Sequence, residues 1–108
     1  MESKQAIEAL GALAQASRLA AFRLLVQAGA QGMAAGKIAE RLDVSPATLS
    51  FHLAYLTRAG LATSRQEGRF VIYSADFEGM GRLLAYLTDD CCGGKACVAV
   101  PMRRTSRS

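Results

Sequence analysis

Apolar residues recur every three or four positions over most of the chain, and this spacing predicts amphipathic α-helices. A first helix is expected over residues 5–15, and Ser17 is placed to cap a second helix that ends before Gly29 and Gly32. The first of these helices carries an apolar stripe of Ile7, Leu10 and Leu13. The second is expected to turn a core face of Leu19, Phe22, Leu25 and Val26 inward.

Two further helices are predicted in the middle of the chain, joined by a tight connection. Residues 33–42 form the first of them and residues 43–45 the connection. In the second helix Ser45 is a good N-cap, Pro46 suits the first helical position, and Gly60 ends the segment. Two helices joined by about three or four residues form a helix-turn-helix, whose second helix enters the major groove of DNA.

The second of these helices has two different faces. Leu49, Leu53 and Leu56 recur at helical spacing and are expected in the core. The opposite face consists of Ala47, Phe51, Ala54 and Arg58, flanked by Thr48, Ser50 and Tyr55. Small and hydroxyl side chains in a first helical turn suit close approach to a flat polar surface, whereas Phe51 is an unusual residue for a solvated face.

After Gly60 the pattern becomes extended. Residues 61–66 and 69–74 predict two strands, with Glu67 and Gly68 at a hairpin turn. A hairpin directly after such a helix is typical of the wing of a winged helix-turn-helix. The hairpin also carries two arginines near its tip, Arg65 and Arg69. They are expected to contact phosphate; the alternative is that both are simply solvated.

A last helix is predicted from the capping residue Asp76 to about Asp90. Its apolar residues are Phe77, Met80, Leu83, Leu84 and Leu87, with Tyr86 beside them. This apolar stripe is wider than packing against one neighbouring element requires. The first helix is similarly apolar. Surplus apolar surface on both terminal helices predicts a homodimer interface; the alternative is ordinary core. The expected fold is therefore mainly α with a small β-hairpin, a winged helix-turn-helix that dimerises through its terminal helices.

The composition narrows the class of protein. With 108 residues, 51% of them apolar and 20% charged, the chain is expected to form one globular domain. Its net charge of +4 suits a polyanionic partner. No membrane association is expected, because the chain has neither a signal-peptide core nor a membrane-spanning apolar stretch. The three cysteines lie together between positions 91 and 97, which predicts a cytoplasmic protein with reduced thiols.

The predicted second helix of the helix-turn-helix is similar to the recognition helix of the ArsR (ArsR/SmtB) family of winged-helix repressors. The helix order, the hairpin ending in Tyr73 and the Ser17-Arg18 pair also resemble this family. The matching pattern is Ser45-x-x-Thr48-x-Ser50-x-His52-Leu53-x-x-Leu56-x-x-Ala59-Gly60-Leu61. The resemblance covers residues 5–90 and implies a homodimer that binds double-stranded operator DNA. It places Ala47, Thr48, Ser50 and Phe51 against base edges, beside the cap Ser45, with His52 supporting the helix.

The sequence departs from the founding arsenic repressors of this family, which carry a Cys-x-Cys-type site on the helix before the recognition helix. Residues 33–42 contain no cysteine, and His52 is the single histidine, so the histidine and carboxylate set of the family's zinc sensors is also missing. What remains is Cys91, Cys92 and Cys97, which resemble the C-terminal Cys-Cys-Gly-Gly…Cys variant of the arsenic-responsive members. This implies release from the operator when trivalent arsenic binds.

The chemistry of the three thiols agrees with that implication. Trivalent arsenic takes a pyramid of three sulfur ligands, antimony is a close analogue, and Gly93 and Gly94 allow the chain to fold back so that Cys97 joins the other two. Zinc fits less well because its structural sites want four ligands. Cadmium, lead or mercury binding and a thiol redox switch are the alternatives. Residues 1–90 are thus expected to bind DNA and dimerise, and residues 91–108 to hold the metalloid and a flexible basic tail.

An enzymatic function is not expected, and no catalytic cofactor is implied. Cys97 and Arg103 have the spacing of the phosphate-binding loop of cysteine phosphatases and some arsenate reductases. That loop needs backbone N–H groups leading into a helix N-terminus. Here the intervening residues include Pro101 and lead into a short polar tail, which disfavours a thiol reductase.

Overall fold

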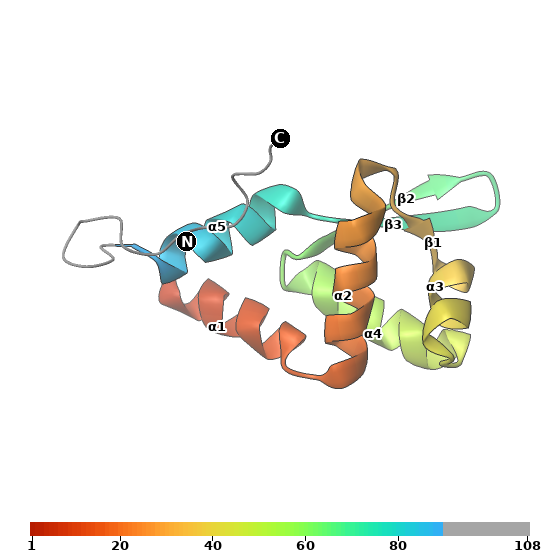
Figure 1. Cartoon of the computed structure of the whole chain (residues 1–108), viewed down its shortest axis with the longest axis horizontal. Helices are drawn as coiled ribbons and strands as arrows, with labels where there is room; N and C mark the ends of the chain where they lie inside the picture. Colours follow the sequence, from red (N-terminus) through yellow and green to blue (C-terminus); the bar gives the residue numbers. More distant parts are fainter. Residues whose placement is uncertain (90–108) are drawn as a thin grey trace.

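The computed structural model describes residues 1–89, which form five α-helices, one short 3₁₀ turn and three strands (Figure 1). The predicted C-terminal segment 91–108, with Cys91, Cys92 and Cys97, lies outside the described residues. In chain order the elements are α1 (Ser3–Leu13), α2 (Ala16–Ala28), η1 (Gly29–Gln31), β1 (Met33–Ala34), α3 (Ala35–Leu42), α4 (Pro46–Arg58), β2 (Ala62–Glu67), β3 (Phe70–Ala75) and α5 (Phe77–Leu87). The predicted fold class, a mainly helical winged helix-turn-helix, is confirmed.

The strands form one antiparallel sheet in the order β1-β3-β2. In the β2–β3 hairpin Glu67 pairs with Phe70, so the two-residue turn is Gly68-Arg69, one residue later than predicted. Gly68 has a φ of 62°, the positive value that such tight hairpin turns require. The strand β1 was not predicted, because two residues are too few to show an alternating pattern. It pairs with the middle of β3 and anchors the hairpin to the helices.

The centre of the protein lies where α2, α3 and α4 meet. The largest fully buried side chains are Leu25, Ile38, Leu49, Leu53, Leu56 and Leu61. Three of these are the apolar residues predicted to form the core face of α4, and that prediction is confirmed. Full burial of one such side chain contributes about 1.5–3 kcal/mol, so this contact fixes α4 firmly against α2 and α3.

Most of the apolar stripe predicted on α1 lies outside the core of the single chain. Its buried residues are Ala6, Ala9 and Ala12, whereas Ile7 is 67% exposed and Leu10 43% exposed. Small side chains let the backbone of α1 approach its neighbours closely. Ile7 and Leu10 therefore point away from the core of the single chain, whereas Leu13 packs against it.

Two details of α2 also differ from the prediction. The N-cap is Gln15, whose side-chain oxygen accepts a hydrogen bond from the backbone N–H of Arg18 at 2.8 Å, and not Ser17. Leu19, expected in the core, is exposed, while Phe22 and Leu25 are buried as predicted. The helix therefore begins earlier and turns a narrower apolar face inward than its sequence suggests.

The last helix begins as predicted and ends earlier. The carboxylate of Asp76 accepts a hydrogen bond from the backbone N–H of Gly79 at 2.9 Å, and the helix ends at Leu87 rather than near Asp90. Gly79 lies against the backbone of Gly60, where any side chain would collide with the Gly60 carbonyl. Figure 1 shows that α5 then runs beside α1, at the opposite end of the molecule from the β2–β3 hairpin.

Within residues 1–89 no single helix has the length and apolar character needed to cross a membrane. The helical segments Ser3–Leu13 and Ala16–Gln31 reach that threshold only when taken together, and they meet at a bend of 99°.

Candidate nucleic-acid interface

The α3–turn–α4 unit is set by local capping interactions. At the end of α3, Asp43 adopts a left-handed conformation with a φ of 55°, which turns the chain toward α4. Ser45 then caps α4: its Oγ accepts a hydrogen bond from the backbone N–H of Thr48 at 3.2 Å and donates one to Thr48 Oγ1 at 2.9 Å. The predicted cap and the following Pro46 are confirmed as the start of α4. The predicted helix before it begins at Ala35, since residues 33–34 belong to β1.

The face of α4 that points away from the core is uncharged for most of its length. The predicted base-facing residues Ala47, Thr48, Ser50 and Phe51 are all exposed, with the cap Ser45 beside them. Phe51 is 67% exposed, and Arg58 in the last turn is the first charged residue after the helix begins. The surface offered to a partner therefore consists of hydroxyl groups, small side chains and one aromatic ring.

His52 does not belong to this exposed face. It is only 8% exposed, and its Nδ1 lies 3.4 Å from Nη1 of Arg18 on α2. Because a guanidinium only donates hydrogen bonds, Nδ1 is the acceptor in this contact. The position suits the supporting role that was predicted for His52.

Arg18 joins three helices around this histidine. Its Nε donates a hydrogen bond to the carbonyl of Ala12 in α1 at 2.8 Å. The same guanidinium lies over the ring of Tyr55, with its central carbon 4.1 Å from the ring centroid. Arg18 thereby connects the α1–α2 junction to α4. Sequence reasoning found Arg18 only as part of a family resemblance, since nothing in its spacing marks the contact.

The two wing arginines are in different surroundings. Arg65 is held by the protein itself: its Nε lies 2.6 Å from Glu67 Oε2, its Nη2 donates to the carbonyl of Gln31 at 2.7 Å, and its Nη1 donates to Ser74 Oγ at 3.2 Å. Arg69 occupies the exposed hairpin turn and makes no hydrogen bond or ion pair with any other residue of the described chain. The side chain at the tip is thus available to a partner, while Arg65 braces the base of the wing. Phosphate contact by either residue stays a prediction.

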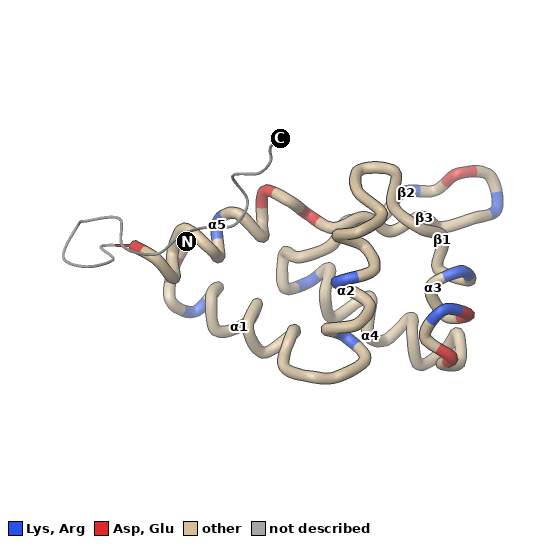
Figure 2. The backbone as a smooth tube through the Cα atoms, in the orientation of Figure 1, with Lys and Arg blue, Asp and Glu red and all other residues tan. Residues whose placement is uncertain are grey.

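Charged residues of both signs lie at the same end of the molecule as the wing. Figure 2 shows lysine and arginine positions on α3 and on the β2–β3 hairpin, interspersed with acidic ones. The charged pairs there are exposed, for example Lys37 with Glu40 on α3 at 3.8 Å. Such pairs contribute little to stability, so their side chains can reorient toward a charged partner.

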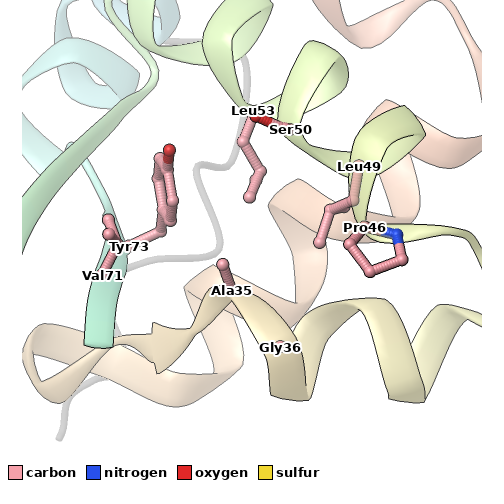
Figure 3. Close-up of a pocket in the computed structure, with 8 residues that line it drawn as sticks. All are labelled: Ala35, Gly36, Pro46, Leu49, Ser50, Leu53, Val71 and Tyr73. Carbon is pink, nitrogen blue, oxygen red and sulfur yellow. The ribbon is translucent and has the colours of Figure 1, made fainter. Parts of the chain in front are cut away.

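A hollow of about 170 Å³ separates the recognition helix from the wing (Figure 3). Its lining residues come from the start of α3, the first half of α4 and strand β3: Ala35, Gly36, Pro46, Leu49, Ser50, Leu53, Val71 and Tyr73. The Tyr73 ring stands from β3 toward α4 across this space (Figure 3). The wing and α4 therefore lie side by side at the surface, with a mainly apolar hollow between them.

The predicted ligand set for a metalloid, Cys91, Cys92 and Cys97, lies beyond the described residues. Among residues 1–89 no group of three or more histidine, cysteine, aspartate or glutamate side chains is placed to hold a metal ion.

Two short helices joined by a turn, with a hairpin directly behind the second, define a winged helix-turn-helix domain. Residues 13–65 match the family described as "Helix-turn-helix domain", and this match spans α2, α3, α4 and part of β2. The chain is also 35% identical over 72 residues to the transcriptional activator HlyU of Vibrio cholerae. That alignment covers 67% of this chain and 64% of the relative, slightly less than two thirds of its length.

Solved structures extend the comparison. HlyU from Vibrio cholerae N16961 is 33% identical with a TM-score of 0.63, and the match covers 81% of this chain and 97% of HlyU. The structure of reduced HlyU is 31% identical with a TM-score of 0.64, and the match covers 83% of this chain and 92% of that chain. A possible transcriptional regulator for arsenical resistance is 32% identical over 74% of this chain and 80% of its own, with a TM-score of 0.65. A homodimeric winged helix-turn-helix domain from Mycobacterium bovis is 28% identical over 89% of both chains, with a TM-score of 0.64. The chain belongs to the ArsR/SmtB family of winged helix-turn-helix regulators.

Proposed function

We propose that the chain is a homodimeric repressor that binds double-stranded operator DNA and is released when trivalent arsenic, or its analogue antimony, binds Cys91, Cys92 and Cys97. The observation that carries the DNA-binding part is the exposed, uncharged face of α4, held rigid by its cap and by buried leucines. A helix with such a face fits the major groove, and the neighbouring wing brings Arg69 toward the phosphate backbone.

The homodimer is supported by the apolar surface left uncovered on α1 and α5. Ile7 and Leu10 are exposed on α1, and α5 beside it exposes four more large side chains: Phe77, Leu84, Tyr86 and Leu87. Two neighbouring helices with this much exposed apolar surface favour a second copy as the cover. One recognition helix reads half of an operator, so a two-fold dimer supplies the pair that a palindromic site requires. The similar domain from Mycobacterium bovis is itself named as homodimeric.

The inducer is proposed from the cysteine set and its place in the chain. In the reducing cytoplasm the three thiols stay available, and three sulfur ligands are what trivalent arsenic prefers. Three residues separate Cys91 from Leu87, the last residue of α5. A chelate that draws in the chain after α5 would shift the dimer contact and so change the spacing of the two recognition helices. One similar protein is named as a possible regulator for arsenical resistance.

A second candidate is a regulator that responds to thiol oxidation or to cadmium or lead at the same cysteines. HlyU is named as an activator, and one of its solved structures is described as the reduced form. These names support testing for a redox response and for activation as well as repression. Both candidates share the fold and the DNA surface and differ in the ligand and in its effect.

The decisive experiment measures release from a selected operator. Fluorescence anisotropy of the labelled operator with the full chain is followed while arsenite, cadmium, zinc and peroxide are titrated in parallel. Arsenite should release the wild type at the lowest concentration, whereas Cys91→Ser and Cys92→Ser should bind the operator normally and ignore arsenite. Cys97→Ser should respond at least to methylated arsenic, which two thiols can hold.

The controls separate the alternatives. Thr88→Ala, beside the cysteine segment, should respond like the wild type. Release by peroxide that a thiol reductant reverses, without release by arsenite, would establish the redox candidate instead. If arsenite still releases Cys91→Ser and Cys92→Ser at the wild-type concentration, the inducer site lies elsewhere.

A further inference from the structure

The recognition helix lacks the side chains that usually read DNA bases. Guanine is read by arginine or lysine and adenine by asparagine or glutamine, each through a pair of hydrogen bonds in the major groove. Between Pro46 and Thr57 the helix carries none of these four residues and no carboxylate. Its first long charged side chain is Arg58, in the last turn. Paired hydrogen bonds from α4 to purines are therefore excluded over the part of the helix that enters a groove.

The hydroxyl groups of α4 have limited reach. Thr48 Oγ1 already accepts a hydrogen bond from Ser45 Oγ at 2.9 Å, so it is partly committed to the helix cap. Ser50 is exposed but short, and it lines the hollow beside the wing (Figure 3). These groups can accept or donate single hydrogen bonds to phosphates or bases, which discriminate weakly between base pairs. A further contribution to sequence discrimination by α4 is then expected from another side chain.

Phe51 is the side chain of α4 that can provide it. It is 67% exposed, and the neighbours on its face of the helix, Ala47 and Ala54, are too small to cover the ring. The ring also packs edge-on against His52, with centroids 6.2 Å apart and planes at 63°. Since His52 is buried and bonded to Arg18, the exposed ring of Phe51 has a fixed neighbour at its edge.

We propose that Phe51 reads thymine by packing against its C5 methyl group in the major groove. This inference rests on the proposed DNA-binding function and specifies what α4 recognises. Thymine is the one standard base with a methyl group in that groove, and phenylalanine is among the side chains that contact it. A 5-methylcytosine presents the same methyl group, so Phe51 should accept it in place of thymine.

The test begins with selection of an operator from random duplex DNA by the full chain. Each thymine of the selected site is then replaced in turn by deoxyuridine, which removes only the methyl group. At one position in each half-site the wild type should lose about fourfold in affinity, the effect of removing one buried methyl. Phe51→Ala should bind the thymine and deoxyuridine operators equally, with an unchanged salt dependence because no charge is removed.

Phe70→Ala is the matched control, since Phe70 is an equally bulky ring that is 58% exposed on the wing. It should keep the thymine preference of the wild type. Replacing the critical thymine by cytosine should weaken wild-type binding, and 5-methylcytosine should restore part of it. A selected operator that binds equally well with deoxyuridine at every position overturns the role of Phe51. Failure to select any operator overturns the proposed function itself, so the two failures are distinct.

Discussion

Arg18 at the start of α2 donates a hydrogen bond to the ring of His52 on the recognition helix, with 3.4 Å between Nη1 and Nδ1. The same guanidinium bonds the carbonyl of Ala12 and stacks on Tyr55. One side chain thus fixes the rotation of α4 relative to the α1–α2 corner.

Replacing Arg18 should therefore destabilise the protein. In Arg18→Ala the carbonyl of Ala12 and the Nδ1 of His52 both lose their donor, which should lower the free energy of unfolding by about 1–3 kcal/mol. Urea denaturation measures this change. Arg23→Ala is the matched control, because Arg23 is an exposed arginine on the same helix and its loss should cost less than about 0.5 kcal/mol. Equal stability of the two variants would show that Arg18 braces nothing.

Contacts of this kind escape sequence reasoning for a simple physical reason. Arg18 and His52 lie 34 positions apart, as do Gln31 and Arg65 at the base of the wing. No short sequence spacing connects such partners. In the sequence, an arginine that bonds two helices looks the same as an arginine that is exposed to solvent. From the sequence, Arg65 and Arg69 have the same expected role near the tip of the hairpin, whereas in the fold their side chains have different surroundings.

The helix-turn-helix, in contrast, was predictable to within about two residues because its signals are local. Ser45 and Pro46 mark the start of α4 through backbone geometry alone, and Gly60, with its φ of 80°, terminates the segment. The boundaries of this unit do not depend on the rest of the fold. DNA contact by its exposed residues remains a prediction, since it depends on a partner.

The inward face of α1 was not predictable from periodicity. The stripe of Ile7 and Leu10 and the stripe of Ala6, Ala9 and Ala12 both recur at helical spacing, and hydrophobicity favours the larger residues as core. The core instead takes the alanines because the helices approach closely there. A second copy that covers Ile7 and Leu10 would account for both stripes.

Removing single hydroxyls from α4 should weaken operator binding without affecting folding. Thr48→Ala and Ser50→Ala each lose a single hydrogen bond to a base or phosphate, and a gel-shift titration should show a loss of about 0.5–1.5 kcal/mol for each. Thr88→Ala is the control, because it removes a half-buried hydroxyl at the C-cap of α5, the helix at the opposite end of the molecule from the wing (Figure 1). Operator affinity unchanged in both α4 variants would place this helix outside the groove.

The two wing arginines should respond differently to substitution. Arg69→Ala removes a charge with no partner among the described residues, so it should reduce the slope of log affinity against log salt by about one and leave stability unchanged. Arg65→Ala should also lower the free energy of unfolding, because Gln31 and Ser74 lose a donor. Salt titrations on specific and non-specific DNA, with urea denaturation of both variants, measure these effects. An unchanged slope for Arg69→Ala would mean that the tip stays in solvent.

A charge on the α1 surface should break the dimer while leaving the fold intact. Ile7→Glu places an unpaired carboxylate in the proposed contact, which should weaken association about 30-fold or more, since burial of such a group costs at least about 2 kcal/mol. Sedimentation at micromolar concentration should show a monomer with the circular dichroism of the wild type. Phe70→Glu, an equivalent change on the wing, should remain dimeric. A monomeric wild type under the same conditions would contradict the proposed interface.

The effects of arsenic and operator DNA on each other must be equal if one dimer equilibrium links them. When arsenite weakens operator binding by some factor, typically about 5–150-fold for coupled sites, the operator-bound dimer must bind arsenite more weakly by the same factor. Four dissociation constants test this: operator for the free and the arsenic-loaded dimer, and arsenite for the free and the operator-bound dimer. In Cys91→Ser the operator constant should not change with arsenite. If arsenite weakens operator binding while its own affinity is the same with and without DNA, release comes from another process such as thiol oxidation, and the cysteine chelate is not the switch.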